Sequence, residues 1–272
     1  MTDLLRQEIA TLAHTIVVKV GSHVLTDDDG RLDDHRIRSL AAQVHQVLLS
    51  GRKVVLVSSG AVASGMGRLG LKQRPTKIQE LQAVAAVGQS LLVEAYERCL
   101  SEYGPHASQV LLTAEDLDRN YKSYFNARNT LRTLMELGAV PIINENDTVS
   151  TRELKNTFGD NDHLAALVAN LLQAPLLVLL SDVDGLYDGD PHDPKSRLIP
   201  TVEKIDRNVR DLVRDKKGQL SKGGMDSKLR AARVVTTSGE NMIIANKPPN
   251  TTVSAGSSIL SILSTESRTS RS

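Results

Sequence analysis

Short apolar runs alternate along the chain with longer segments of helical periodicity. The pattern predicts strands over 15–20, 53–60, 107–113, 139–144, 174–182 and 240–246. Between them it predicts helices over 32–51, 77–104, 121–138, 161–174 and 223–239, several of which end at a glycine. Strands that alternate with helices in this way indicate an α/β fold in which a mostly parallel sheet is covered by helices on both faces.

Polar residues collect where these strands end, which is where ligands bind in parallel sheets. Lys19 lies near the end of the first strand, directly before Gly21 and Ser22. A lysine in an apolar strand is costly to bury unless an anion meets it, and the backbone N–H groups of Gly21 and Ser22 suit phosphate oxygens. The second strand runs into SSG (58–60), at the predicted start of a helix whose N–H groups could receive an anion.

The densest polar cluster is NENDTVSTRELKNTFGDNDHL (144–164), which connects the fourth strand to the next helix. Its carboxylates and amides could hold a metal ion, perform acid–base chemistry or bind a small polar substrate, or the segment could be a solvated loop. We expect its middle, 150–158, to form a mobile flap. A further cluster, SKGGMDSKLRAA (221–232), opens a helix with two glycines and carries Lys222 and Lys228, a pattern that suits a polyphosphate. Cations, an anion cradle and a polar clamp at one sheet edge are the parts that phosphoryl transfer needs.

Composition narrows the classes of function. The 272 residues carry 33 Lys and Arg against 32 Asp and Glu, so neither a nucleic-acid nor a membrane partner is expected. The single cysteine, Cys99, falls on an apolar helical position and is interpreted as a core residue. No apolar run is long enough to span a bilayer, and the N-terminus lacks the order of a signal peptide. We expect a soluble cytoplasmic protein.

Three familiar patterns are rejected. GMGRLG (65–70) matches a dinucleotide fingerprint in letters only, because it does not follow a strand directly. The acidic run DVDGLYDGDPHD (182–193) lacks the oxygen spacing and the closing glutamate of a calcium loop, and reads as turns with a small hairpin. The chain contains no Walker A sequence, so a P-loop enzyme is excluded.

The motifs VKVGSHVL, VSSGAVASG, AAVGQ, NARNTL, PIINENDTV, FGDNDHLAALVA, LLSDVDGLY and GGMDSKLRAA occur in an order that resembles the amino acid kinase family over about 15–245. The resemblance implies an open αβα sandwich that binds an amino acid beside ATP. The INEND–GDND pairing is most similar to the members that phosphorylate the γ-carboxylate of L-glutamate at the start of proline biosynthesis.

Residue roles follow from the same resemblance. Lys19 and Lys228 would be the cations that stabilise the transferred phosphoryl group, and Asp162 would orient both of them. Substrate binding would fall to Ser59, Asp147 and Asn161, with Asp147 on the ammonium group of glutamate. ATP would be bound by Lys19, Ser181, Asp182, Lys222, Gly223, Gly224, Met225, Asp226, Ser227 and Lys228. Mg²⁺ would be held mainly by the phosphates and water rather than by a metal site of the protein.

The resemblance also sets expectations for organisation. We expect an amino acid kinase domain over 1–250 and a poorly ordered Ser/Thr-rich tail over 251–272, without the C-terminal PUA domain that many members carry. Lys222 stands where the family more often has a small or hydroxyl residue. Dimers or tetramers and feedback inhibition by proline are implied for family members.

Two alternatives stay open. Another kinase of this fold would act on aspartate, N-acetylglutamate, carbamate or a nucleoside monophosphate. The second alternative is a non-catalytic amino-acid sensor with this fold. The presence of Lys19, Lys228 and Asp162 together argues against a sensor.

Overall fold

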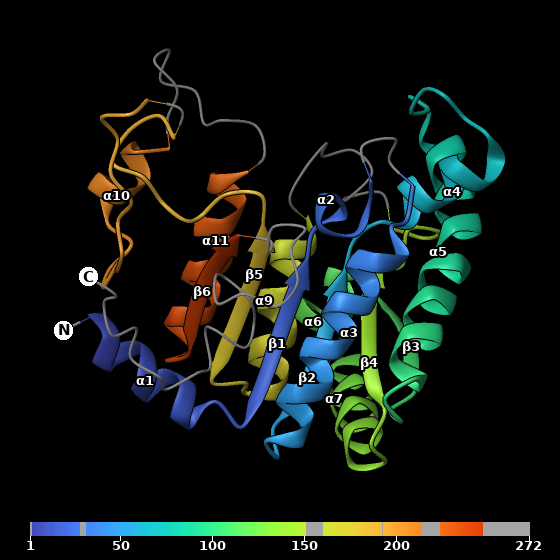
Figure 1. Cartoon of the computed structure of the whole chain (residues 1–272), viewed down its shortest axis with the longest axis horizontal. Coiled ribbons are helices and arrows are strands. Elements are labelled where there is room, and N and C mark those ends of the chain that lie inside the picture. The colour runs from blue at the N-terminus through green and yellow to red at the C-terminus, as the bar shows by residue number, and fades with distance from the viewer. Residues whose placement is uncertain (1, 28–30, 151–159, 192, 214–223, 247–272) are drawn as a thin grey trace.

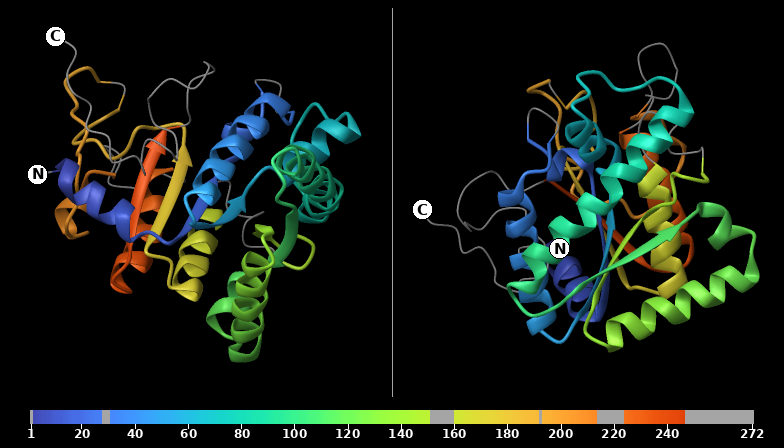
Figure 2. Two further views of the ribbon diagram at one scale, coloured as in Figure 1. Left: turned by 60° about the horizontal axis from the view of Figure 1, so that its bottom comes forward. Right: turned by 90° about the vertical axis from the view of Figure 1, so that its right-hand side faces the viewer.

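The structure is a computed structural model that describes residues 2–27, 31–150, 160–191, 193–213 and 224–246. Its centre is a six-stranded sheet in the order β3-β4-β2-β1-β5-β6, and every pairing between neighbouring strands is parallel. The bounds are β1 (Thr15–Val20), β2 (Lys53–Ser58), β3 (Ala107–Leu112), β4 (Val140–Glu145), β5 (Leu176–Ser181) and β6 (Asn241–Asn246). Figure 2 (left) shows β5 and β6 side by side, with both arrowheads at the same edge of the sheet.

Helices cover both faces of the sheet (Figure 1), which confirms the predicted open αβα sandwich. One face packs against α1 (Thr2–Leu12), α2 (Ser22–Leu25), α3 (Asp34–Leu49) and α5 (Ile78–Ser101). The other face packs against α6 (Ala114–Asp118), α7 (Tyr121–Glu136), α9 (Asp160–Leu172) and α11 (Met225–Thr237). The remaining helices are α4 (Ala61–Leu69), which packs on α5, and α10 (Arg207–Asp211).

The alternation of side chains along β1 decides where Lys19 points. Ile16, Val18 and Val20 belong to the core on the α3 and α5 face, whereas Val17 belongs to the core on the α9 face. Because successive side chains of a strand point to opposite faces, Lys19 shares the α9 face with Val17. β1 lies between β2 and β5, so Lys19 stands near the middle of the sheet and not on an edge strand.

The contact between α4 and α5 depends on two glycines. A Cβ atom added to Gly65 would lie 1.9 Å from the carbonyl oxygen of Val84, and one added to Gly88 would lie 1.8 Å from that of Ala61. No side chain fits at either position without moving a helix. The GMGRLG pattern therefore reflects helix packing at Gly65, in agreement with its rejection as a nucleotide fingerprint.

Some elements differ from the sequence-based expectations. α1 was not anticipated, and β2 and β5 end one or two residues before the apolar runs do. The hairpin expected after β5 is reduced to a single antiparallel bridge between Tyr187 and Leu198. Cys99 is fully buried in the core, as predicted. The tail (251–272) and most of the predicted flap (151–158) lie outside the described residues.

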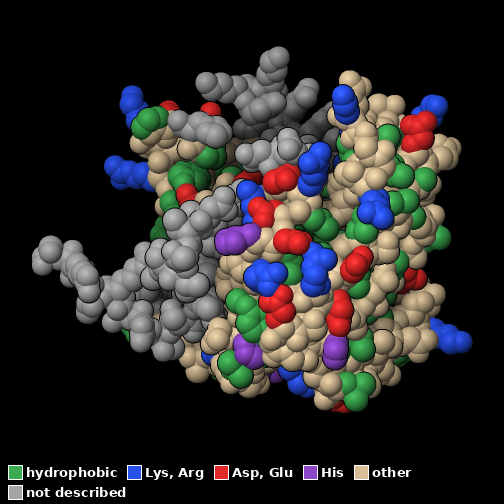
Figure 3. All heavy atoms as spheres, turned by 45° about the vertical axis from the view of Figure 1, so that its right-hand side comes forward, with side chains coloured by type: hydrophobic (Ala, Val, Ile, Leu, Met, Phe, Trp, Pro, Cys, Tyr) green, Lys and Arg blue, Asp and Glu red, His purple; other side chains and the backbone are tan. Residues whose placement is uncertain are grey.

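The surface carries no field of a single sign on the face shown in Figure 3, where acidic and basic side chains are interspersed. This distribution agrees with the formal net charge of +1. Within the described ranges, no helix is both long enough and apolar enough to cross a membrane.

Candidate active site

Two lysines from distant parts of the chain meet on one carboxylate at the carboxyl edge of the sheet. Lys19 Nζ of β1 lies 2.8 Å from Oδ1 of Asp162 on α9, and Lys228 Nζ of α11 lies 3.8 Å from its Oδ2. The Ser227 hydroxyl donates to the same Oδ2 at 2.6 Å. We call Lys19, Asp162 and Lys228 the cation centre. The Asp162 side chain is 1% exposed and the two lysine side chains about a tenth, so the centre is almost fully removed from water.

The charges of the cation centre depend on one another. Burial alone would raise the pKa of Asp162, but Lys19 and Lys228 together with the hydrogen bonds from Lys19 and Ser227 lower it, so the carboxylate stays ionised. Burial lowers the pKa of Lys228, and the neighbouring positive charge of Lys19 lowers it further against the opposing effect of Asp162. The centre therefore holds two cations and one anion, a net positive charge that could accept a polyphosphate.

The end of β5 supplies the next pair of predicted residues. The Ser181 hydroxyl donates to the Asp182 carboxylate at 3.1 Å, beside the end of β1. Although partial burial raises the pKa of Asp182, hydrogen bonds from its own backbone N–H and from Ser181, with the charge of Lys228, lower it. Gly21 leaves space beside the cation centre, because a Cβ atom there would lie 3.7 Å from Lys19 Nζ.

The start of α11 places the remaining described residues of the glycine-rich segment. Gly224 has a φ of 89°, a left-handed conformation that favours glycine, and it directly precedes the first helical residue. Asp226 is held by Arg230 at 2.5 Å, and the Met225 side chain packs on a small apolar cluster around Leu229. The N-terminal N–H groups of α11 thus lie one turn from Lys228. Lys222 and Gly223 lie outside the described residues.

Buried amides connect the second polar cluster. Asn161 Nδ2 of α9 donates to Ser59 Oγ at 2.9 Å and to Asn144 Oδ1 at 3.1 Å. Asn144, in β4, donates in turn from Nδ2 to Gln89 Oε1 of α5 at 2.8 Å. We call Ser59, Asn161, Asn144 and Gln89 the amide chain. Asn161 and Asp162 are consecutive, so one turn of α9 joins the amide chain to the cation centre.

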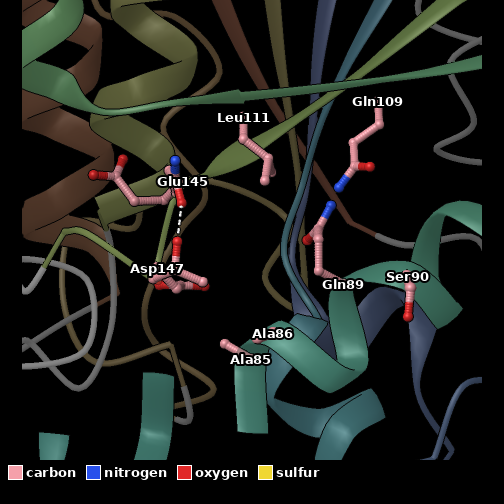
Figure 4. A pocket seen from close by; sticks show the side chains of 10 residues that line it. Ala85, Ala86, Gln89, Ser90, Gln109, Leu111, Glu145 and Asp147 are labelled. Atoms are coloured by element: carbon pink, nitrogen blue, oxygen red, sulfur yellow. Dashed lines mark hydrogen bonds between the residues drawn. The ribbon is translucent and has the colours of Figure 1, made fainter. Parts of the chain in front are cut away.

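Asp147 lies in a pocket next to this chain (Figure 4). The pocket has a volume of about 180 Å³, and among the residues that line it are Ala85, Gln89, Leu111 and Asp147. Asp147 is 7% exposed, and burial raises its pKa to about 6 against the opposing charge of Arg74. A buried carboxylate with a raised pKa binds a cationic partner more favourably than an exposed one does, because its charge is not solvated.

The described residues predicted for the site thus meet at one edge of the sheet, at the ends of β1, β2, β4 and β5 and the starts of α9 and α11. Sequence reasoning placed Asn144 in the polar cluster after the fourth strand, but it missed Gln89 and the charge of Arg74 near Asp147. It had quoted AAVGQ as a motif, and the glutamine after a helix-packing glycine was the available signal for Gln89. Among the described residues no group of three or more His, Cys, Asp or Glu side chains could hold a metal ion.

Residues 14–246 match the family model described as the amino acid kinase family. The chain belongs to the amino acid kinase family. Among curated members of this family, the chain is 48% identical over 242 residues to a protein of Rhodopirellula baltica named glutamate 5-kinase, an alignment that covers 89% of this chain and 62% of that protein. It is 50% identical over 235 residues to a glutamate 5-kinase of Pseudomonas savastanoi pv. phaseolicola, covering 86% and 63%. The chain therefore spans about three fifths of the length of the curated relatives it matches.

Solved structures of the amino acid kinase fold agree with this membership. A carbamate kinase from Giardia lamblia bound to AMP-PNP superposes with a TM-score of 0.56 at 19% identity, covering 86% of this chain and 92% of that one. A UMP kinase from Ureaplasma parvum gives 0.54 at 18% identity, covering 86% and 89%. At these identities the likeness shows the fold alone.

Proposed function

We propose that the chain transfers the γ-phosphoryl group of ATP to the γ-carboxylate of L-glutamate, giving L-glutamyl 5-phosphate and ADP, the first step of proline biosynthesis. The observation that carries the proposal is the meeting of Lys19 and Lys228 on Asp162 at the carboxyl edge of the sheet. The names of the relatives, with about half of the aligned residues identical, support glutamate as the acceptor.

The chemistry needs electrostatic stabilisation more than a base. An oxygen of the γ-carboxylate, which is already anionic, attacks the γ-phosphorus, and the bond from that phosphorus to the β–γ bridging oxygen breaks, so that ADP leaves with the electron pair. Lys19 and Lys228 would stabilise the negative charge that spreads over the phosphoryl oxygens, an effect that cations supply elsewhere at ~10³–10⁵ in rate. Asp162 would hold both ammonium groups in place and would not take a proton.

We assign the nucleotide to the β5 and α11 side of the cation centre. Ser181, Asp182 and the start of α11 would contact ATP, since α11 is 13 residues long and its N-terminal N–H groups carry partial positive charge. Both carboxylate oxygens of Asp162 are occupied by Lys19, Lys228 and Ser227, which fits Mg²⁺ bound mainly by phosphates and water. When bound, Mg²⁺ would neutralise part of the phosphate charge.

The amino acid is assigned to the β2 and β4 side. Ser59, oriented by its hydrogen bond from Asn161, would donate to the reacting end of glutamate next to the cation centre. Asp147 would accept hydrogen bonds from the ammonium group of glutamate. With a pKa of about 6, Asp147 is mostly ionised at neutral pH, as this contact requires.

We extend the proposal to the setting of the enzyme. The kinase domain covers about 1–250, the protein acts in the cytoplasm as a homodimer or homotetramer, and proline is a feedback inhibitor. Neither nucleic acid nor membrane is a partner, in line with the mixed surface charge.

Release of ADP with L-glutamate and Mg-ATP, in the presence of hydroxylamine to trap the acyl phosphate, tests the reaction. We expect glutamyl hydroxamate and ADP in equal amounts. The same assay is repeated with aspartate, N-acetylglutamate, carbamate and nucleoside monophosphates as the acceptor in place of L-glutamate. Turnover of N-acetylglutamate without turnover of glutamate would overturn the assignment of the acceptor, and binding of glutamate without any ADP release would favour a sensor.

A further inference from the structure

The donor and acceptor atoms of the amide chain can be assigned from one backbone group. The N–H of Glu145 donates to the side-chain oxygen of Asn144 at 2.9 Å. A backbone N–H can only donate, so the Asn144 atom that faces it must be Oδ1, and the other atom, Nδ2, must be the one that faces Gln89. Gln89 consequently presents Oε1 to Asn144, in accord with their 2.8 Å hydrogen bond.

The same assignment extends in the other direction. Because Asn144 Oδ1 is an acceptor, the atom of Asn161 that approaches it at 3.1 Å must be Nδ2. That nitrogen also donates to Ser59 Oγ at 2.9 Å, so both of its protons are used inside the protein. Ser59 accepts in this contact and keeps its own hydroxyl proton to donate to a ligand.

At the far end of the amide chain, the assignment leaves Gln89 with a buried donor. Its Oε1 faces Asn144, which turns Nε2 toward Gln109 along the wall of the pocket shown in Figure 4. Gln89 is 8% exposed, and within the described part of the chain Nε2 has no hydrogen-bond partner. Buried donors in native proteins are nearly always paired, so an acceptor supplied by a bound ligand would satisfy this nitrogen.

The opposite side of the pocket presents the complementary group. Asp147 is as deeply buried as Gln89, and its Oδ1 likewise has no hydrogen-bond partner among the described residues. Ala85 and Ala86 lie between the two in Figure 4, and the Glu145 carboxylate is turned away from Gln89. A neutral donor and an anionic acceptor across a small pocket match the head group of an α-amino acid, whose carboxylate accepts hydrogen bonds and whose ammonium group donates them.

We propose that Gln89 is a substrate-binding residue whose Nε2 donates a hydrogen bond to the α-carboxylate of the amino acid held through its ammonium group by Asp147. The inference rests on the proposed function, because it takes L-glutamate as the occupant of this pocket. Gln89 also has a positioning role, since its Oε1 fixes Asn144 and, through Asn144, the orientation of Asn161 and Ser59. One glutamine would thus bind the α-carboxylate of the substrate and also orient the residues at its reacting end.

A comparison of two ligands isolates the first role. 4-Aminobutyrate is L-glutamate without its α-carboxylate, so the ratio of their dissociation constants measures what the α-carboxylate contributes. The ratio is obtained by calorimetry, with 4-aminobutyrate measured by displacement of L-glutamate. In the wild-type protein we expect L-glutamate to bind about 30-fold more tightly or better, and in Gln89→Met we expect this ratio to fall by ~10-fold or more, as for a lost hydrogen bond to a charged group. Because each ratio is taken on one variant, partial loss of folding cancels.

Two further variants separate direct contact from positioning. Gln89→Glu keeps an acceptor for Asn144 but replaces Nε2 by a carboxyl oxygen, so the ratio measured at neutral pH should also fall. Gln79→Met, on the exposed side of the same helix, is the matched control and should keep the wild-type ratio.

A wild-type ratio in Gln89→Met or in Gln89→Glu would overturn the contact, and so would equal binding of the two ligands by the wild-type protein. The ratio is read from binding and does not depend on turnover. A wild-type protein that shows the ratio but forms no hydroxamate contradicts the proposed function and leaves the Gln89 contact standing, whereas hydroxamate formation with an unchanged ratio in Gln89→Met contradicts only the contact.

Discussion

The cation centre and the amide chain meet on consecutive residues of α9, but the first consists of charged side chains and the second of neutral ones. The cation centre is formed by charged groups, with two ammonium groups sharing one carboxylate that is 1% exposed. The amide chain contains no charge and relies on donors and acceptors whose directions are fixed from Asn144 outward. The first can stabilise a change in charge, and the second can only distinguish shapes and hydrogen-bond patterns.

This difference indicates a division of labour within one site. Interactions that accelerate the reaction must be stronger in the transition state than in the ground state, and mobile negative charge is what changes during phosphoryl transfer. In the proposed reaction the head group of the amino acid keeps the same charges throughout, so fixed amides and the Asp147 carboxylate would be sufficient to bind it. Single substitutions should affect the two functions separately, with effects that range from a loss of turnover to a small change in KM.

Removal of a cation should affect turnover and spare recognition. We expect Lys228→Ala to lower kcat by ~10³-fold or more, because one of the two charges that would stabilise the phosphoryl oxygens is lost. Arg233→Ala, an exposed position on the same helix, is the matched control and should retain wild-type kcat. Initial rates of ADP release measure both. In the wild-type protein, kcat should also decline as the solution becomes alkaline. The decline should begin at a lower pH than the ordinary pKa of lysine would give, because the pKa of Lys228 is lowered.

Neutralising the shared carboxylate should reduce both kcat and stability. Asp162→Asn leaves two buried ammonium groups without their anion, so we expect unfolding to become easier by about 3–5 kcal/mol and kcat to fall ~10²-fold through misplaced lysines. Urea denaturation and initial rates give the two values. The folded-state pKa of Asp162 is lowered, so its ionised form contributes stability above the ordinary aspartate pKa, and that contribution is lost as pH falls through the folded value. An equal stability deficit at every pH would contradict the ion-pair explanation.

Replacing Asp147, the proposed partner of the glutamate ammonium group, should have the opposite effect to Lys228→Ala, because it should weaken binding more than it lowers turnover. Asp147→Asn should raise the KM for L-glutamate by about 10–100-fold while kcat changes much less. In the wild-type protein, glutamate affinity should weaken as pH falls below about 6, since Asp147 then takes up a proton. Calorimetric titrations at a series of pH values measure this, and a variant with unaltered pH dependence would place the titrating group elsewhere.

The same substitution should stabilise the unliganded protein. The folded-state pKa of Asp147 is raised, so the folded state binds its proton more tightly than the unfolded chain, and stability from this group declines as pH rises from about 4 to 6. At pH 8 Asp147→Asn should therefore have a higher Tm than the wild type without ligand. A lower Tm would show that the carboxylate has a stabilising partner.

The smallest effect on activity is expected where α5 is held against α4. Gly88→Ala places a Cβ atom 1.8 Å from the Ala61 carbonyl oxygen, so α5 must shift and carry the adjacent Gln89 with it. We expect a loss of about 1–3 kcal/mol in unfolding free energy and a several-fold rise in the KM for L-glutamate. The KM for ATP should change much less, because Gln89 of α5 is connected to α9 indirectly, through Asn144 and Asn161. Val87→Ala, exposed on the same helix, should be close to wild type.

Most of the sheet could be predicted because its strands are short apolar runs in regular alternation with helices. The side of the sheet on which Lys19 lies follows from the alternation of side chains along a strand. Lys19 is two residues after Val17, so it must point to the same face as Val17. The amide chain could not be predicted in this way. Gln89 lies between Gly88 and Ser90 of a long helix, and its pairing with Asn144 joins positions 55 residues apart. Ser227 resembles an ordinary first-turn serine until α11 is docked beside α9.

The separation of charge from recognition is tested most directly by the dissociation constant of L-glutamate without nucleotide, measured by calorimetry for the wild-type protein, Lys228→Ala and Asp147→Asn. Our account predicts that Lys228→Ala binds L-glutamate within about threefold of the wild type while its hydroxamate formation is lost, and that Asp147→Asn binds at least ~10-fold more weakly. If Lys228→Ala loses binding as severely as it loses turnover, while Asp147→Asn binds normally, the division of labour is contradicted.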